Sequence, residues 1–216
     1  GFLSITGSPE APTKAGCSIA DIAAGMYAYS NILAALLQRA QTGFGAGIDV
    51  SMLESMVEWM SYPMYYAYDG APPPPRAGAA HATIHPYGPF AAGDGKVVML
   101  GLQNEREWAG FCADVLRQPA LATDERFASN SRRTAARAEL HAIIVAAFAP
   151  LTADQVIERL DAAQIANARM NDMHEVWAHP QLAARQRRAD VQTSAGPVRA
   201  PLPPGSDVCA VAGLLR

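Results

Sequence analysis

A single carboxylate stands at the start of the most apolar stretch of the sequence, where it is well placed to do chemistry. Asp21 is the fourth residue of SIADIAAGMYAYSNILAALLQR, residues 18–39. An ionised carboxylate is a nucleophile that can take up an acyl group as a covalent intermediate. The first turn of a helix suits this role, because the helix dipole stabilises negative charge and free backbone N–H groups can bind a developing oxyanion.

Residues 18–39 predict a long buried helix that positions this carboxylate. Large apolar side chains recur at helical spacing, and small residues between them allow close packing. The apolar positions are Ile22, Met26, Tyr29, Leu33, Leu36 and Leu37, and the small ones are Ala23, Ala24, Gly25, Ala34 and Ala35. We expect such a helix inside a domain.

Asp21 also has an ordinary structural interpretation. Ser18 followed three residues later by Asp21 fits a capping box, in which each side chain accepts a hydrogen bond from a free backbone N–H of the first turn. A carboxylate there gains about 0.3–1 kcal/mol from the helix dipole. The helix pattern alone leaves both the structural and the catalytic role open.

The overall composition indicates a globular chain without a nucleic-acid footprint. The 216 residues are 50% hydrophobic and 17% charged, which suffices for one large or two small domains. The net charge is −3, and the arginines are scattered apart from pairs at 132–133 and 187–188. We therefore expect no nucleic-acid partner.

Cysteine usage and hydropathy predict a cytoplasmic location. Cys17, Cys112 and Cys209 are odd in number and far apart, which argues against a disulfide framework and for a reducing compartment. Cys112 is expected to be a small buried hydrophobe. No apolar run reaches the ~18–20 residues of a membrane span without polar interruption, and we expect neither a signal peptide nor a membrane partner.

The first seventy residues predict an α/β crossover unit. A loop rich in Gly and Pro, residues 1–16, leads into the long helix, and a glycine turn at 41–47 is followed by a buried strand at 48–51 and a helix at 51–68. The Gly-x-Gly-x-Gly of residues 43–47 follows a helix and precedes a strand, the reverse of a dinucleotide fingerprint, so we do not expect a phosphate site. The Met and aromatic residues of 51–68 predict core packing or a subunit contact.

A proline-rich linker, residues 71–80, predicts a domain boundary, and a smaller α+β domain follows it. Its elements are a hairpin with strands at 88–91 and 96–100 around Asp94-Gly95, helices at 104–116, 133–148 and 152–163, a strand near 168–170, helices at 173–178 and 180–187, and strands at 189–191 and 196–201. Thr152 and Gln155 form a capping-box pattern.

The histidines predict structure rather than metal binding. His81 and His85 lie four apart, but Pro86 and the strand-like surroundings make a helical pair unsuitable, and no carboxylate or Cys completes a ligand set. We expect both to be hydrogen-bonded structural histidines, and we expect no metal site.

The ordered series of motifs resembles the class III coenzyme A transferases, the formyl-CoA transferase and carnitine CoA-transferase type, also called CaiB/BaiF-like. The resemblance rests on Asp21, Gly25, residues 32–36, Arg39, residues 42–45 and 48–55, then residues 80–84, 86–90, 94–95, 103–105 and Trp108. It covers about nine tenths of the chain, up to about Pro204. It implies that Asp21 is the nucleophile that carries the acyl group and then CoA.

The resemblance also implies an α/β fold, the back part of a Rossmann-like large domain plus a smaller α+β domain. The implied organisation is part of the large domain at 1–70, a linker at 71–84, the small domain at 85–192, and a return segment at 193–216 with an atypical tail. Coenzyme A would be a co-substrate, contacted mostly by an N-terminal half that precedes this chain, with no permanently bound cofactor. Family members form interlocked homodimers.

The activity implied is transfer of CoA from an acyl-CoA to a small carboxylic acid through an aspartyl-CoA thioester. Residues 81–90 look most like branches acting on dicarboxylic acids. One alternative is an α-methylacyl-CoA racemase, in which Asp21 would be a general base paired with an upstream His. Racemases tend to have a glycine run where Ala23 and Ala24 stand, which favours the transferase. A second alternative is an incomplete, catalytically inert fragment.

Overall fold

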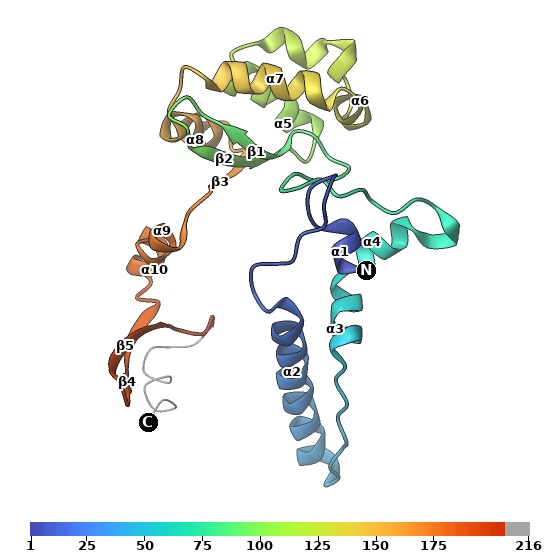
Figure 1. The fold of residues 1–216 in the computed structure, drawn as a ribbon, viewed down its shortest axis with the longest axis vertical. Helices are drawn as coiled ribbons and strands as arrows, with labels where there is room; N and C mark the ends of the chain where they lie inside the picture. Colours follow the sequence, from blue (N-terminus) through green and yellow to red (C-terminus); the bar gives the residue numbers. More distant parts are fainter. Residues whose placement is uncertain (206–216) are drawn as a thin grey trace. The chain divides into compact units, whose positions relative to one another are not determined.

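The computed structural model describes residues 1–205 and separates the chain into two compact units, Gly1–Ala168 and Arg169–Arg216 (Figure 1). The predicted domains at 1–70, 85–192 and 193–216 and the linker at 71–84 stay predictions. The division by compactness lies between residues 168 and 169. The atypical tail and Cys209 lie outside the described residues from position 206 on.

The first unit begins with a short helix and a pair of longer helices. Helix α1 spans Phe2–Ile5, α2 spans Ile19–Thr42, and α3 spans Met52–Trp59 and packs against α2 (Figure 1). Gly43 caps the C-terminus of α2, because it adopts a left-handed φ of 78° and donates its N–H to the carbonyl of Arg39 at 2.8 Å. The long predicted helix is therefore confirmed, with nearly the predicted bounds.

The expectation that this helix is buried was wrong for the described chain. Ala23 is the one buried residue of α2. Its large apolar side chains are exposed, including Met26 at 61%, Tyr29 at 64% and Leu37 at 70%. Helix α3 covers too little of α2 to bury the stripe that the sequence pattern shows.

The predicted strand at 48–51 does not form, and residues 43–51 have no regular structure. A strand needs a hydrogen-bonding partner strand, and residues 1–70 contain no strand, so the predicted crossover unit and Rossmann-like part are absent from that segment. Residues 51–68 also differ from expectation. They form α3, then α4 at Ser61–Tyr66, followed by the 3-10 turn η1 at Tyr68–Gly70.

Two local features explain how residues 51–66 divide. Ser51 caps α3, because its Oγ accepts the N–H groups of Leu53 and Glu54 at 3.1 and 3.3 Å. Pro63 has no N–H and is accommodated in the first turn of α4, where helix N–H groups lack acceptors. Most large side chains here are exposed rather than in a core, namely Met52, Leu53, Trp59, Tyr62, Met64, Tyr65 and Tyr66.

The core of the first unit lies in residues 87–165. Strands β1, Tyr87–Ala91, and β2, Val97–Gly101, form the predicted antiparallel hairpin, with Phe90 opposite Val98. Strand β3, Ala166–Arg169, completes a three-stranded sheet of order β1-β2-β3. The helices are α5 at Glu105–Gly110, the π-helical η2 at Phe111–Val115, the 3-10 turns η3 at Pro119–Thr123 and η4 at Glu125–Phe127, α6 at Asn130–Ala135, α7 at Arg137–Phe148 and α8 at Ala153–Ala162.

Apolar side chains from these elements form one cluster. Its largest members include Phe90, Val98, Trp108, Phe111, Phe127, Leu140, Ile144, Phe148, Val156 and Leu160. Cys112 is buried among them as predicted, and burial raises the pKa of its thiol to about 12.

Thr152 and Gln155 make the predicted capping box of α8. Asp94 links the hairpin turn to α8, because its carboxylate accepts the N–H groups of Lys96 and Ala153 at 3.2 and 3.1 Å.

Arg133 is a buried cation that joins three segments of this core. Its guanidinium, 3% exposed, donates to both carboxylate oxygens of Glu105 at 2.7 and 2.9 Å. It also donates to the carbonyls of His85 and Phe127 at 3.2 and 3.0 Å, and it lies 4.9 Å from the centre of the Trp108 ring. The buried charge is therefore paired and hydrogen-bonded, as burial requires.

The second unit contains α9 at Met173–Trp177, α10 at Pro180–Ala184 and an antiparallel hairpin of β4, Arg188–Thr193, with β5, Gly196–Pro201. Asp172 and Glu175 form a capping box at the start of α9. A cavity of about 340 Å³ in this unit is lined mainly by apolar residues, among them Trp177, Leu182 and Leu202.

By length and composition, α2 would suffice to cross a membrane. Polar side chains interrupt it, and the long core helix of a soluble protein meets the same criterion. The absence of a membrane partner stays a prediction.

Replacing Arg133 by Met should lower the free energy of unfolding by about 3 kcal/mol. Met keeps much of the side-chain volume but leaves two buried carbonyls without donors and Glu105 without its cation. Urea denaturation measures the loss. Arg106→Met, at an exposed arginine on α5, is the matched control and should stay within about 0.5 kcal/mol. Equal effects of the two substitutions would contradict the structural role of Arg133.

The ion pair of Arg133 with Glu105 should also make the free energy of unfolding depend on pH in the acidic range. The hydrogen bond from Arg133 lowers the pKa of Glu105 in the folded protein. The stabilisation is thus present above the ordinary pKa of Glu and is lost as the pH falls through the lowered value. Unfolding curves measured at several acidic pH values should show a shallower pH dependence for Arg133→Met than for the wild type.

Candidate active site

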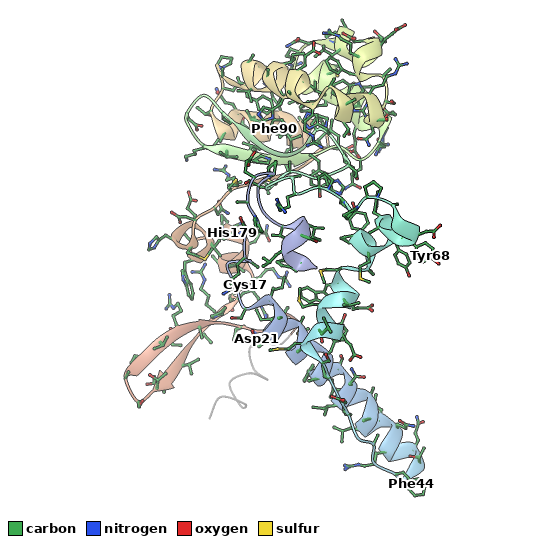
Figure 2. The ribbon with its side chains drawn as sticks, turned by 45° about the vertical axis from the view of Figure 1, so that its right-hand side comes forward. Cys17, Asp21, Phe44, Tyr68, Phe90 and His179 are labelled. Carbon is green, nitrogen blue, oxygen red and sulfur yellow. The ribbon has the colours of Figure 1, made fainter. Side chains whose placement is uncertain are left out.

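Asp21 lies in the first turn of α2 with its carboxylate exposed (Figure 2). The predicted capping box was wrong. Ser18 is the N-cap residue, but its side chain makes no cap hydrogen bond. No hydrogen bond or ion pair joins the Asp21 carboxylate to any residue in 1–205. The structural interpretation of Asp21 as part of a cap therefore loses its basis.

Of the four backbone N–H groups around Asp21, residues 19–22, two are hydrogen-bonded and two are free within residues 1–205. The N–H of Ile19 bonds to the carbonyl of Cys17 at 2.9 Å, and that of Ile22 to the carbonyl of Ser18 at 3.0 Å. The N–H groups of Ala20 and Asp21 have no acceptor among the described residues. A helix N-terminus with free donors stabilises negative charge placed against it.

Gly25 stands one turn after Asp21 on the same face of α2. A Cβ added there would meet nothing within 4 Å. Glycine in a helix interior costs roughly 0.5–1 kcal/mol relative to alanine, and no close contact within the described chain requires it. Its effect is to leave the surface beside the Asp21 carboxylate open.

The loop before α2 is tied to the proline-rich linker. Arg76 donates from Nε to the carbonyl of Ser8 at 2.9 Å and from Nη2 to the carbonyl of Pro9 at 3.0 Å. The N–H of Gly78 donates to the carbonyl of Gly7 at 2.8 Å. Gly7 has a φ of 120°, and a Cβ there would lie 2.3 Å from the Ala11 carbonyl, so glycine is required.

The linker therefore helps to place the segment that leads into Asp21, a role that the sequence analysis missed for Arg76. The available signal was a lone arginine directly after four prolines.

The two neighbouring histidines differ in environment. His81 is a structural histidine as predicted, since its Nδ1 accepts the N–H groups of Thr83 and Ile84, both at 3.1 Å. Burial, together with the charge of Arg137, lowers the pKa of His81. The prediction for His85 was wrong. The ring is 3% exposed and neither ring nitrogen has a hydrogen-bond partner.

Burial lowers the pKa of His85 to about 4, and the charges of Arg137, His141 and Arg133 add to this effect. Within residues 1–205, no three His, Cys, Asp or Glu side chains gather in a way that would hold a metal ion.

Comparison with known proteins links this arrangement to a family. The model of CoA-transferase family III matches residues 1–206. The succinate–glutarate CoA-transferase of Agrobacterium fabrum is 34% identical over 200 residues, which are 92% of this chain and 49% of that protein. The succinyl-CoA:glutarate CoA-transferase of Homo sapiens is 31% identical over 183 residues, 84% of this chain and 41% of that protein.

A solved structure has a similar fold. The crystal structure of a CAIB/BAIF family protein from Brucella suis has a TM-score of 0.76 and 29% identity, and the match covers 100% of this chain and 60% of that one. The predicted mixed α/β class is confirmed at this level. The chain spans about half the length, or less, of the curated relatives it matches. The match of the family model to residues 1–206 shows that this chain belongs to CoA-transferase family III.

Proposed function

We propose that Asp21 is the nucleophile of an enzyme that transfers coenzyme A from an acyl-CoA to a small dicarboxylic acid. The observation that carries the proposal is the Asp21 carboxylate itself, exposed at the start of α2 without a cap or ion-pair partner in residues 1–205. The curated relatives support the substrate class, since their names specify succinate and glutarate as CoA donors or acceptors.

The proposed reaction proceeds by exchange of bonds at one carboxylate. A carboxylate oxygen of Asp21 attacks the thioester carbonyl of the acyl-CoA, the C–S bond breaks, and CoA leaves as the thiolate. The thiolate attacks the Asp21 carbonyl of the resulting anhydride, which releases the first acid as its carboxylate and leaves an aspartyl-CoA thioester. The acceptor carboxylate attacks that thioester, and the thiolate released then attacks the acceptor carbonyl, which frees Asp21.

The local geometry supports this sequence of steps. Each attack produces an oxyanion, and the free N–H groups of Ala20 and Asp21 are donors beside the place where it forms. Gly25 leaves room for the acyl group over the carboxylate. Coenzyme A enters and leaves as a co-substrate, so the reaction needs no resident cofactor. By resemblance to the family we expect a homodimer, and cysteine usage favours a reducing, cytoplasmic compartment.

The proposed function predicts a covalent adduct on Asp21. Incubation with succinyl-CoA, followed by hydroxylamine and digestion, should convert the Asp21 side chain to a hydroxamate that is detected by the mass of its peptide. Because the chain spans about half the length of its relatives, the reaction is run on the longest natural polypeptide that contains it and on residues 1–216 separately.

Asp21→Ala should give no adduct, whereas Glu58→Gln, at an exposed carboxylate on α3, should react like the wild type. An unmodified Asp21 peptide in the longer polypeptide would refute the transferase proposal for this donor. Deuterium from solvent entering a 2-methylacyl-CoA would instead identify the racemase alternative. Reaction of the longer polypeptide alone would show that residues 1–216 are inert by themselves.

The proposed function also predicts the effect of a substitution at Gly25. Gly25→Ala should raise the free energy of unfolding by about 0.5–1 kcal/mol, since alanine is the better helix former and the new Cβ meets nothing. It should at the same time lower kcat/KM for CoA transfer, because the methyl group lies beside the Asp21 carboxylate. Ala28→Gly, one turn further along α2, should destabilise by a similar amount and leave transfer unchanged. Unchanged activity in Gly25→Ala would contradict the role given to the open surface.

A further inference from the structure

The first unit contains a cavity that takes no part in the chemistry proposed for Asp21. Its volume is about 650 Å³, within the range of small-molecule sites. Residues from the linker, β1 and α7 line it, among them Ala80, His85, Phe90, Arg137, Ala138 and His141. No residue of α2 is part of its wall.

Arg137 brings an uncompensated positive charge to this cavity. Its Nη2 donates to the carbonyl of His81 at 2.9 Å and, less closely, to those of Ala82 and Ile84, both at 3.4 Å. Its Nε and Nη1 have no partner among residues 1–205, and no carboxylate in that range pairs with it. Partial burial already lowers the pKa of Arg137, so an anion placed against the two free donors would be favourable.

His85 adds a second unsatisfied group. It is 3% exposed, and neither Nδ1 nor Nε2 has a hydrogen-bond partner. A buried polar group without a partner costs roughly 1–3 kcal/mol. With a pKa of about 4 the ring is neutral near pH 7, so it offers one N–H donor. The ring nitrogens are covered, so contact with a ligand requires the ring to turn.

His141 contributes a third polar ring. It is exposed and stacks on Phe90 with ring centres 5.0 Å apart and an interplanar angle of 28°. The cavity therefore combines an apolar wall with donors from an arginine and histidines, and it has no carboxylate of its own. Groups of this kind bind a planar anion, and Arg forms paired hydrogen bonds with a carboxylate.

We propose that this cavity binds a small molecule through its carboxylate, which accepts hydrogen bonds from Nε and Nη1 of Arg137 and from His85, with His141 beside it. The site is separate from Asp21 and does not depend on the transferase chemistry. The carboxylate has two conceivable sources, an acid that is also a substrate or an acid that only regulates, and both present the same group to Arg137.

The test is calorimetric titration of the protein with succinate and with propionate. Arg137 is kept, because it also holds residues 81–84 in place. Two variants remove the site instead: His85→Phe removes the ring nitrogens, and Ala138→Leu fills the cavity from a position on α7. Saturable binding should be at least about tenfold weaker in both. In His85→Phe a hydrogen bond to the carboxylate is lost, and in Ala138→Leu the larger side chain occupies the space of the ligand. Asp21→Ala should bind as the wild type does.

A stability measurement accompanies the titration. His85→Phe should unfold at the same or a higher urea concentration than the wild type, since it removes two unpaired polar atoms from a buried site. If His85→Phe does not fold, Ala138→Leu carries the binding test, because its side chain is exposed at that position. Preference for succinate would show that the site selects a dicarboxylic acid, the class proposed as substrate, and equal binding of propionate would show that one carboxylate suffices, as for an acid that is not a substrate.

Two results would overturn the proposal. One is the absence of saturable binding by either acid at millimolar concentration. The other is binding that survives in His85→Phe and Ala138→Leu but disappears in Asp21→Ala, which would assign the binding to the region of Asp21.

Discussion

The apolar face of α2 must be covered before the carboxylate at its start can act as proposed. Within the described chain one residue of α2, Ala23, is buried, while Met26, Tyr29 and Leu37 are largely exposed. Burying a side chain of this size is worth about 1.5–3 kcal/mol, so the helix has a strong tendency to pack against another surface. An acyl-aspartate or aspartyl thioester also needs protection from water. One covering surface would meet both requirements.

The polar residues in the middle of α2 agree with such a cover. Ser30 donates its hydroxyl to the carbonyls of Met26 and Tyr27 at 3.0 and 3.1 Å, and Asn31 donates to that of Tyr27 at 2.8 Å. Each of these two side chains thus has a hydrogen-bond acceptor within the helix itself. The homologous structure from Brucella suis is longer than this chain, which covers 60% of it. Helix α2 has the composition of an interior helix and the exposure of a surface one.

Local signals in the sequence predicted much of the fold. The hairpin at Asp94-Gly95, the capping box of Thr152 and Gln155, and the bounds of α2 follow from residues close together in the chain. The prediction of a strand at 48–51 was wrong because a strand needs a hydrogen-bonding partner strand. The prediction that α2 is buried was wrong because hydropathy indicates which face of a helix favours burial and does not show whether a packing partner is present.

The candidate site likewise has features that the sequence predicts and features that only the folded chain shows. Asp21 could be found from its place in an ordered series of motifs, whereas the partners of Arg76, His85 and Arg137 depend on the folded chain. His81 and His85 show the limit most clearly, because two histidines four residues apart have opposite hydrogen-bonding states.

The bonds from Arg76 to Ser8 and Pro9 join residues 68 and 67 positions apart, and they therefore close a large loop that contains both α2 and α3. Closing a long flexible loop has an entropic cost that is paid before the contact contributes any stability. Helix formation and pairing of α2 with α3 shorten the flexible part of that loop and reduce the cost. The hydrogen bonds from Arg76 are thus expected to form late in folding. The segment preceding Asp21 then acquires its final position only after the helices beside it have formed.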